Sequence, residues 1–266
     1  MRTTRSAVAL MALCRFGVVG CEGEPKQPLA PAASALASAR PATAQSYQLR
    51  VETRGSKVSF TMEAPLERIH GELNDALSGE IFLDPTNLTK TRALIRVDLD
   101  ELVLFQQRRE DEKQEYGNRH KSDLQNEHAR TWLQISDEGP AEERKKNAVA
   151  LFSLTELTDA SVRGLPELGG NLRKVIVSAT GQLLLHGRKA KKTVELAIEV
   201  QLDDGRPKVV RVRTKKPLTV NLEQHDVRPR QAFSKLADKT LSALGAKVNK
   251  EPQVSLDFEA RLVGTK

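Results

Sequence analysis

Apolar and polar residues alternate along several short segments of the chain. Every second residue is apolar in residues 57–64 (KVSFTMEA), and the same alternation runs through residues 93–99, 194–201 and 254–261. Successive side chains of a β-strand point to opposite faces, so this period predicts strands with one dry and one wet face. Such strands close on themselves or pack on a second sheet. We therefore expect a mainly β protein, either a barrel or a sandwich.

Turn signals separate the alternating segments. They include Asp84-Pro85, Gly169-Gly170 and the run Asp203 to Pro207. Short connections of this kind join neighbouring antiparallel strands. We therefore expect an antiparallel order.

Two segments break the alternation. Residues 104–148 are highly charged and predict a helical insertion at one mouth of the sheet, with Trp132 in its strongest apolar cluster. Residues 228–248 carry an apolar stripe at helical spacing, with Pro229 near the start and Gly245 at the end. This pattern predicts a C-terminal amphipathic helix packed on the sheet, with a helix on a membrane surface as the alternative.

The N-terminus is typical of an export signal. Arg2 and Arg5 precede an apolar run over residues 7–13, and the small residue Gly20 ends the segment. The run is too short for a membrane span, which needs roughly 20 apolar residues. We expect residues 1–20 to be a signal peptide, with a cytosolic protein as the alternative.

The sequence VVGC, ending at Cys21, resembles the lipobox of bacterial lipoproteins. The resemblance implies a diacylated Cys21, an anchor in the membrane and a domain facing the periplasm, at the outer membrane more than the inner. Ordinary cleaved secretion is the alternative. Residues 22–45, rich in Pro, Ala and Ser, predict a tether between this anchor and a domain over residues 46–264.

Composition narrows the function classes. The 266 residues suffice for one sizeable core, and the net charge of +7 comes from basic residues mixed with acidic ones. Aromatic residues make up only 4% of the chain and form no stripe with basic residues, so we do not expect the protein to bind nucleic acid. No spacing of Cys and His suggests a metal site, and no catalytic motif is present. The dipeptide His186-Gly187 is typical of a turn. We expect that the protein is not an enzyme and that it has no cofactor.

The order of the segments resembles the YceI-like family of exported, lipocalin-like proteins, over residues 46–264. The segments that carry the resemblance are GSKVSFTMEAPLERIHGEL (55–73), SGEIFLDPTNL (78–88), ALIRVDLDEL (93–102), NEHARTWLQI (126–135) and ATGQLLLHGRKAKKTVELAIEV (179–200). The resemblance implies an antiparallel barrel of about eight strands. It also implies that the interior holds a polyisoprenoid or a similar long-chain lipid.

The dry faces of the expected strands predict which residues line that interior. They are Val58, Phe60, Met62, Ile95, Val97, Leu99, Leu183, Leu185, Val194, Leu196, Ile198, Leu256 and Phe258. His128 and Trp132, four residues apart on one helical face, are candidates for contact with a lipid headgroup. The alternative is that Trp132 seals the core with His128 as its neighbour.

Two main hypotheses for the function remain open. The first is a non-catalytic lipoprotein that holds a long apolar chain. The second is a barrel with a filled core that docks a protein partner, because a barrel of this size either fills its inside with side chains or holds one slender ligand. An unrecognised enzyme is a third reading, and the sequence carries no signal for an oligomeric state.

Overall fold

The computed structural model describes residues 39–228 and 250–264. The strands are β1 (Tyr47–Val51), β2 (Lys57–Ala64), β3 (Glu67–Asn74), β4 (Leu77–Leu83), β5 (Arg92–Asp98), β6 (Val103–Arg108), β7 (His120–Lys121), β8 (Val149–Thr158), β9 (Leu172–Leu185), β10 (Arg188–Asp203), β11 (Arg206–Thr214), β12 (Leu218–Thr219) and β13 (Gln253–Leu262). The helices are α1 (Asp123–Leu133), α2 (Ala141–Asn147) and the 3-10 turns η1 (Leu88–Lys90), η2 (Leu99–Glu101), η3 (Leu165–Glu167) and η4 (Glu223–His225).

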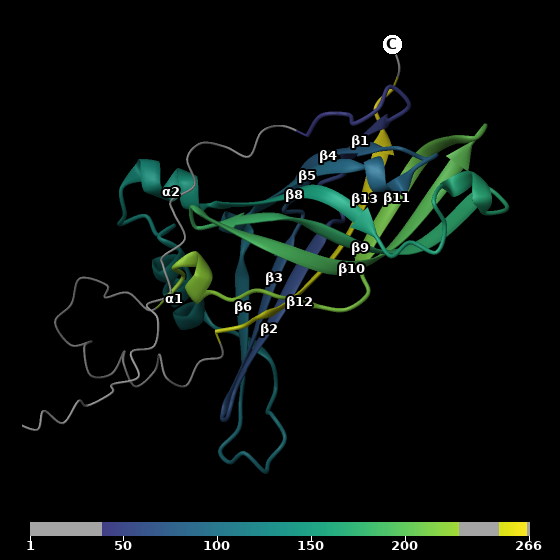
Figure 1. The fold of residues 1–266 in the computed structure, drawn as a ribbon. Coiled ribbons are helices and arrows are strands. Elements are labelled where there is room, and N and C mark those ends of the chain that lie inside the picture. The colour runs from purple at the N-terminus through teal and green to yellow at the C-terminus, as the bar shows by residue number, and fades with distance from the viewer. Residues whose placement is uncertain (1–38, 229–249, 265–266) are drawn as a thin grey trace, which may run out of the picture.

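Eight antiparallel strands close into a barrel. Their order is β1-β4-β5-β8-β9-β10-β11-β13, and β13 returns to pair with β1 (Figure 1). Closure leaves the strands of the ring with partners on both sides, which removes the exposed edges of an open sheet. The expected antiparallel, lipocalin-like barrel of about eight strands is confirmed.

A branch of the sheet leaves the barrel at β13. The first half of β13 pairs with β2, and the sheet continues through β3 and β6 to β7. This branch extends past the barrel in Figure 1. The chain passes from the barrel to the branch near Ser56 and returns near Asp75. A hydrogen bond from the amide of Asp75 to the carbonyl of Ser56 (2.9 Å) holds these two points together. The hydroxyl of Ser56 also accepts a hydrogen bond from the amide of Leu77 (3.1 Å).

The strand register places the alternating apolar residues on one common inner face. Val58 lies opposite Leu256, Ile95 opposite Phe152, and Leu196 opposite Val177, each on a neighbouring strand. Directly opposite residues of antiparallel strands share a face of the sheet. The period-two pattern of the sequence thus reports the inside of the barrel.

Two boundaries differ from the sequence-based expectation. Leu99, expected on the inner row of a strand, opens the turn η2, because the carboxylate of Asp98 accepts a hydrogen bond from the amide of Asp100 (3.1 Å) and ends β5. Leu99 is nevertheless buried. Residues 104–108, expected within the helical insertion, belong to β6, where Leu104 and Gln106 are buried in alternation.

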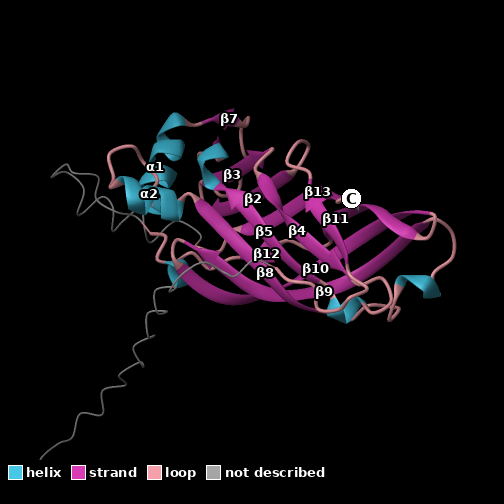
Figure 2. Cartoon of the chain, turned by 90° about the horizontal axis from the view of Figure 1, so that it is seen from above, coloured by secondary structure: helices cyan, strands magenta, loops and turns pink. Residues whose placement is uncertain are grey.

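The charged insertion contributes α1 and α2, which lie together at one end of the sheet (Figure 2). Ser122 caps α1 by accepting a hydrogen bond from the amide of Gln125 (3.3 Å). Asn126 faces β6: its amide oxygen accepts from the amide of Leu104 (2.9 Å), and its nitrogen donates to the Leu104 carbonyl (3.2 Å). The helix therefore satisfies an edge of β6 that no strand covers at Leu104.

Several expected segments lie outside the described residues. They are the signal peptide over residues 1–20, Cys21, most of the tether and nearly all of the amphipathic helix over residues 228–248. The last residues of the tether are described. There, the hydroxyl of Thr43 donates a hydrogen bond to the carboxylate of Asp84 (2.7 Å).

Candidate functional site

The barrel interior has a packed end, formed where β13 finishes. Val51, Ala260, Val210 and Val200 follow one another across four neighbouring strands, and each is at most 4% exposed. Burial of each such side chain stabilises the fold by roughly 1.5–3 kcal/mol relative to an exposed position. Side chains fill the barrel at this end.

Two loops close the packed end. Leu88 of η1 and Leu165 of η3 are both buried in the core, and the amide of Leu165 donates to the carbonyl of Pro85 (2.7 Å). Asp84, itself 1% exposed, accepts hydrogen bonds from the hydroxyl and amide of Thr86 (2.7 and 3.0 Å) and the amide of Asn87 (2.9 Å). Burial raises the pKa of Asp84, but these hydrogen bonds and the one from Thr43 outweigh it, so the pKa is lowered from 3.8.

The opposite half of the interior forms an open end. Along β13, the inward residues change from the fully buried Ala260 to the partly exposed Leu256 and Val254. Along β10, they change from the buried Val200 to the partly exposed Ile198 and Leu196, and Val194 is buried again. The inward residues of the open end that keep accessible surface are Phe60, Met62, Phe152, Leu183, Leu196, Val254 and Leu256. An inward apolar side chain keeps accessible surface only where no neighbouring side chain fills the space beside it.

Two glycines shape this open end. The ring of Phe60 lies over Gly71 on the neighbouring strand, in the place that a Cβ atom would take. The ring of Phe152 lies over Gly181 in the same way, 2.6 Å from the position of such a Cβ. The ring of Phe152 thus lies along the wall of the barrel, and the ring of Phe60 lies along the branch, over β3.

The sequence-predicted lining residues differ in how deeply they are buried. Val58, Ile95, Leu185, Val194 and Phe258 are buried in the core, as is Leu99 in η2, outside the strands. Val97, Leu183, Leu196, Ile198 and Leu256 are partly buried and pack against that core, whereas Phe60 and Met62 keep accessible surface beyond it. The twelve on strands share the inner face. Whether they contact a ligand stays a prediction.

His128 and Trp132 occupy one face of α1. Their rings stack with centroids 6.4 Å apart and planes within 3° of parallel. Trp132 is partly buried and packs against the core cluster. Contact of this pair with a headgroup stays a prediction.

The barrel wall has a seam beside β10. The ladder between β10 and β11 begins at Leu196, preceded by a hydrogen bond from the amide of Lys215 to the carbonyl of Glu195 (2.9 Å). Within the described residues, no backbone-to-backbone hydrogen bond joins residues 188–194 to residues 216–228. The ammonium of Lys192 bridges this seam by donating to the carbonyl of Thr219 (3.3 Å).

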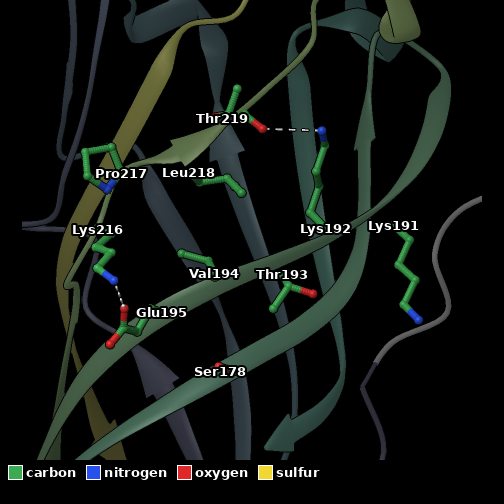
Figure 3. A pocket seen from close by; sticks show the side chains of 10 residues that line it. All are labelled: Ser178, Lys191, Lys192, Thr193, Val194, Glu195, Lys216, Pro217, Leu218 and Thr219. Atoms are coloured by element: carbon green, nitrogen blue, oxygen red, sulfur yellow. Dashed lines mark hydrogen bonds and ion pairs between the residues drawn. The ribbon is translucent and has the colours of Figure 1, made fainter. Parts of the chain in front are cut away.

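A pocket of about 460 Å³ lies at this seam (Figure 3). Val194 and Leu218 lie between the two lysines that bridge it, Lys192 and Lys216, while Lys191 points away from both. Val194 belongs to the core cluster and Leu218 packs against it. The pocket is therefore lined in part by side chains of the barrel core.

Lysines dominate the rim of the pocket. Lys191, Lys192 and Lys216 line it, with Glu195 as the acidic lining residue. Glu195 is paired with Lys215 (2.8 Å) and Lys216 (3.3 Å), and hydrogen bonds from these two ammonium groups lower its pKa. The carboxylate is thus already occupied.

A buried histidine pins the end of the seam. His225 is fully buried, and its Nδ1 lies 3.1 Å from the carbonyl of Arg188 and 3.3 Å from that of Leu185. Nδ1 of the neighbouring His186 lies 3.1 Å from the carbonyl of His225. Burial lowers the pKa of His225 from 6.5, which favours the neutral ring.

Sequence reasoning missed the seam and its histidine. The basic turn GRKAKK (residues 187–192) is visible in the sequence, but the partner segment with Lys216 and Leu218 lies 24 residues or more away. A period-two pattern predicts a strand, but it does not predict where two neighbouring segments lack backbone hydrogen bonds. His225 carried no signal, because its partners are backbone carbonyls.

The described residues lack two features of other functional classes. No three or more His, Cys, Asp or Glu side chains gather there in an arrangement suited to a metal ion. Within the same ranges, no helix combines the length and the apolar character that a membrane crossing requires.

Comparisons with known proteins give a structural likeness alone. No protein-family model matches the chain, and no curated protein matches it. Among solved structures, the chain is similar to a polyisoprenoid binding domain from Saccharophagus degradans implicated in plant cell wall breakdown. The sequences are 14% identical, the TM-score is 0.48, and the match covers 81% of this chain and 98% of that chain.

Proposed function

We propose that the barrel binds a long apolar chain, of the polyisoprenoid or a similar lipid class, and that it catalyses no reaction. The observation that carries the proposal is the open end. Apolar inward side chains from β2, β8, β9, β10 and β13 keep accessible surface there, whereas Val51, Val200, Val210 and Ala260 of the packed end are at most 4% exposed. An eight-stranded barrel can hold one small ligand, and we infer that this end of the interior accommodates it.

The shape of the open end favours a slender ligand. The rings of Phe60 and Phe152 each lie over a glycine of the neighbouring strand, and we infer that a slender chain fits beside them. Each methylene of a bound chain contributes about 0.8 kcal/mol on burial, so a long chain gains affinity without a polar motif. The filled-core module is the less favoured function, because a filled core would bury Leu183 and Leu256.

The experiment is native mass spectrometry of the purified protein, followed by organic extraction of the same sample. We expect a mass adduct that matches an extracted long-chain lipid. Leu183→Trp should reduce this lipid severalfold, because the larger ring enters the free space beside Phe152. Leu184→Trp is the matched control: its side chain is on the other face of β9, and it should leave the lipid content unchanged.

An outcome with no extractable lipid from the wild type contradicts the proposal. Equal loss of lipid in both tryptophan variants also contradicts it, because the effect would then not depend on the inner face.

We further propose that the protein works as a lipoprotein of the cell envelope, anchored through Cys21. The lipobox-like sequence that ends at Cys21 supports this, and two acyl chains suffice for stable attachment. Cys21→Ser should move the protein from the membrane fraction to the soluble fraction. A wild-type protein that is already soluble would contradict the anchor.

A further inference from the structure

We propose that the seam beside β10 binds the anionic head, a phosphate or a similar group, of the chain held in the barrel. This inference rests on the proposed function, since it concerns one end of the same ligand. It assigns a place in the wall where a charged head remains outside while the apolar chain lies inside.

The first support is the chemistry of the pocket. Its rim carries Lys191, Lys192 and Lys216. Glu195 is engaged by Lys215 and Lys216, so it leaves the other cations without a carboxylate in the pocket. Lys191 is exposed and forms no ion pair with any residue in the described ranges. An anion at this rim would meet a surplus of positive charge.

The second support is the backbone of β10. Successive residues of a strand direct their N–H and C=O groups to opposite sides. Because the carbonyl of Glu195 faces residue 215, the amides of Thr193 and Lys191 face the seam as well. Within residues 39–228 and 250–264, neither amide has a hydrogen-bond partner. Two strand-edge donors therefore lie beside the lysines.

The third support is the connection to the interior. Lys192 alternates with Val194 along β10 and lies opposite Gly181, so it belongs to the inward row of the strand. Its ammonium reaches the seam at Thr219, while the aliphatic stem stays at the barrel wall. Val194 belongs to the core cluster and Leu218 packs against it, and both line the pocket. A ligand of mixed character would meet an apolar wall and a cationic rim together.

The test compares two probes with one chain and different heads, geranylgeraniol and geranylgeranyl phosphate. Binding to the full-length protein is measured by native mass spectrometry at matched concentrations. We expect the phosphate to bind the wild type more tightly than the alcohol. The triple variant Lys191→Gln, Lys192→Gln and Lys216→Gln should lose about tenfold in affinity for the phosphate. It should keep its affinity for the alcohol.

The control removes the same charge elsewhere. Lys90→Gln, Lys113→Gln and Lys145→Gln change three exposed lysines away from the seam, and they should leave both affinities unchanged. Equal loss in the two triple variants would reduce the effect to net charge and overturn the seam. Thermal unfolding of both variants checks that the fold is intact.

Further outcomes separate the two proposals. If the alcohol and the phosphate bind the wild type equally, the seam proposal fails and the lipid-binding function stands. If neither probe binds, both fail. Inorganic phosphate alone is the last arm: if it displaces geranylgeranyl phosphate at equimolar concentration, the seam binds free phosphate and the assignment to a lipid head is overturned.

Discussion

The two ends of the barrel are built from the same kinds of side chain, but they differ in how far those side chains fill the space. At the packed end, Val51, Val200, Val210 and Ala260 come from neighbouring strands and are almost completely buried. At the open end, larger residues such as Phe152 and Leu183 keep accessible surface. The size of a side chain thus does not set its burial, and the missing Cβ of Gly181 leaves room for the ring of Phe152.

Apolar volume alone does not decide whether a barrel is filled. The packed end is closed by two plugs, Leu88 and Leu165, from loops outside the ring of strands. The open end has a seam in its wall and a branch of the sheet that leads away from it. Whether a barrel end is filled therefore depends on the segments that cover it as much as on the side chains that line it.

A buried charge should separate the two ends most strongly. Val200→Asp places an unpaired carboxylate in the packed end, and we expect a loss of about 3–5 kcal/mol in the free energy of unfolding. Leu183→Asp, at the open end, should cost about 1–2 kcal/mol, because water reaches the new carboxylate. Urea unfolding followed by circular dichroism measures both. Similar costs would mean that the two ends are equally filled.

An added methyl group should distinguish the two glycines of the open end. At Gly181, the new Cβ would meet the carbonyl oxygen of Ser153, which is backbone and cannot turn away. We expect Gly181→Ala to cost about 1–3 kcal/mol. At Gly71, the Cβ would meet only ring atoms at the far end of the Phe60 side chain, which can shift more easily than backbone. Gly71→Ala should therefore cost less, and the midpoint of thermal unfolding tests the order of the two.

A change of pH should give the smallest effect, and it reports on the seam. The pKa of His225 is lowered from 6.5 by burial, so the unfolded chain takes up this proton more readily than the folded protein. The free energy of unfolding should therefore decrease as the pH falls below about 6.5. Asp84 affects the stability at lower pH. Because its pKa is lowered from 3.8, its contribution to the free energy of unfolding is lost only as the pH falls below about 3.8.

The variant His225→Gln tests this assignment. We expect a weaker dependence of stability on pH between about pH 7 and pH 5 than in the wild type. His120→Gln, which changes an exposed histidine of β7, should leave that dependence as it is. An unchanged dependence in His225→Gln would assign the proton to another group.

The sequence predicts which face of a strand each residue occupies, but it does not predict how deeply that residue is buried. Alternation placed Val58, Leu196 and Leu256 on one side of their strands, and the register agrees, because the period of a strand is fixed by its backbone. Alternation does not report what lies across the barrel. Alternation therefore does not predict that Val200 is fully buried whereas Leu183 keeps accessible surface.

Long-range partners explain the other misses. The carboxylate of Asp84 is held by Thr43, 41 residues earlier, and the seam joins Lys192 to Thr219, 27 residues later. Neither pair has a local spacing rule. Leu99 continues the apolar period, which predicts a strand, whereas the hydrogen bond that the amide of Asp100 donates to the carboxylate of Asp98 turns the chain first.

The position of β13 has a consequence for synthesis. This strand, at residues 253–262, pairs with β1, β2, β11 and β12, so it closes the ring and also carries the branch. At about 5–20 residues per second, β1 leaves the ribosome roughly ten seconds or more before its partner is made. Until then, β1, β2 and β11 lack their shared neighbour. The nascent chain thus remains an open sheet, available to chaperones, until its last strand arrives.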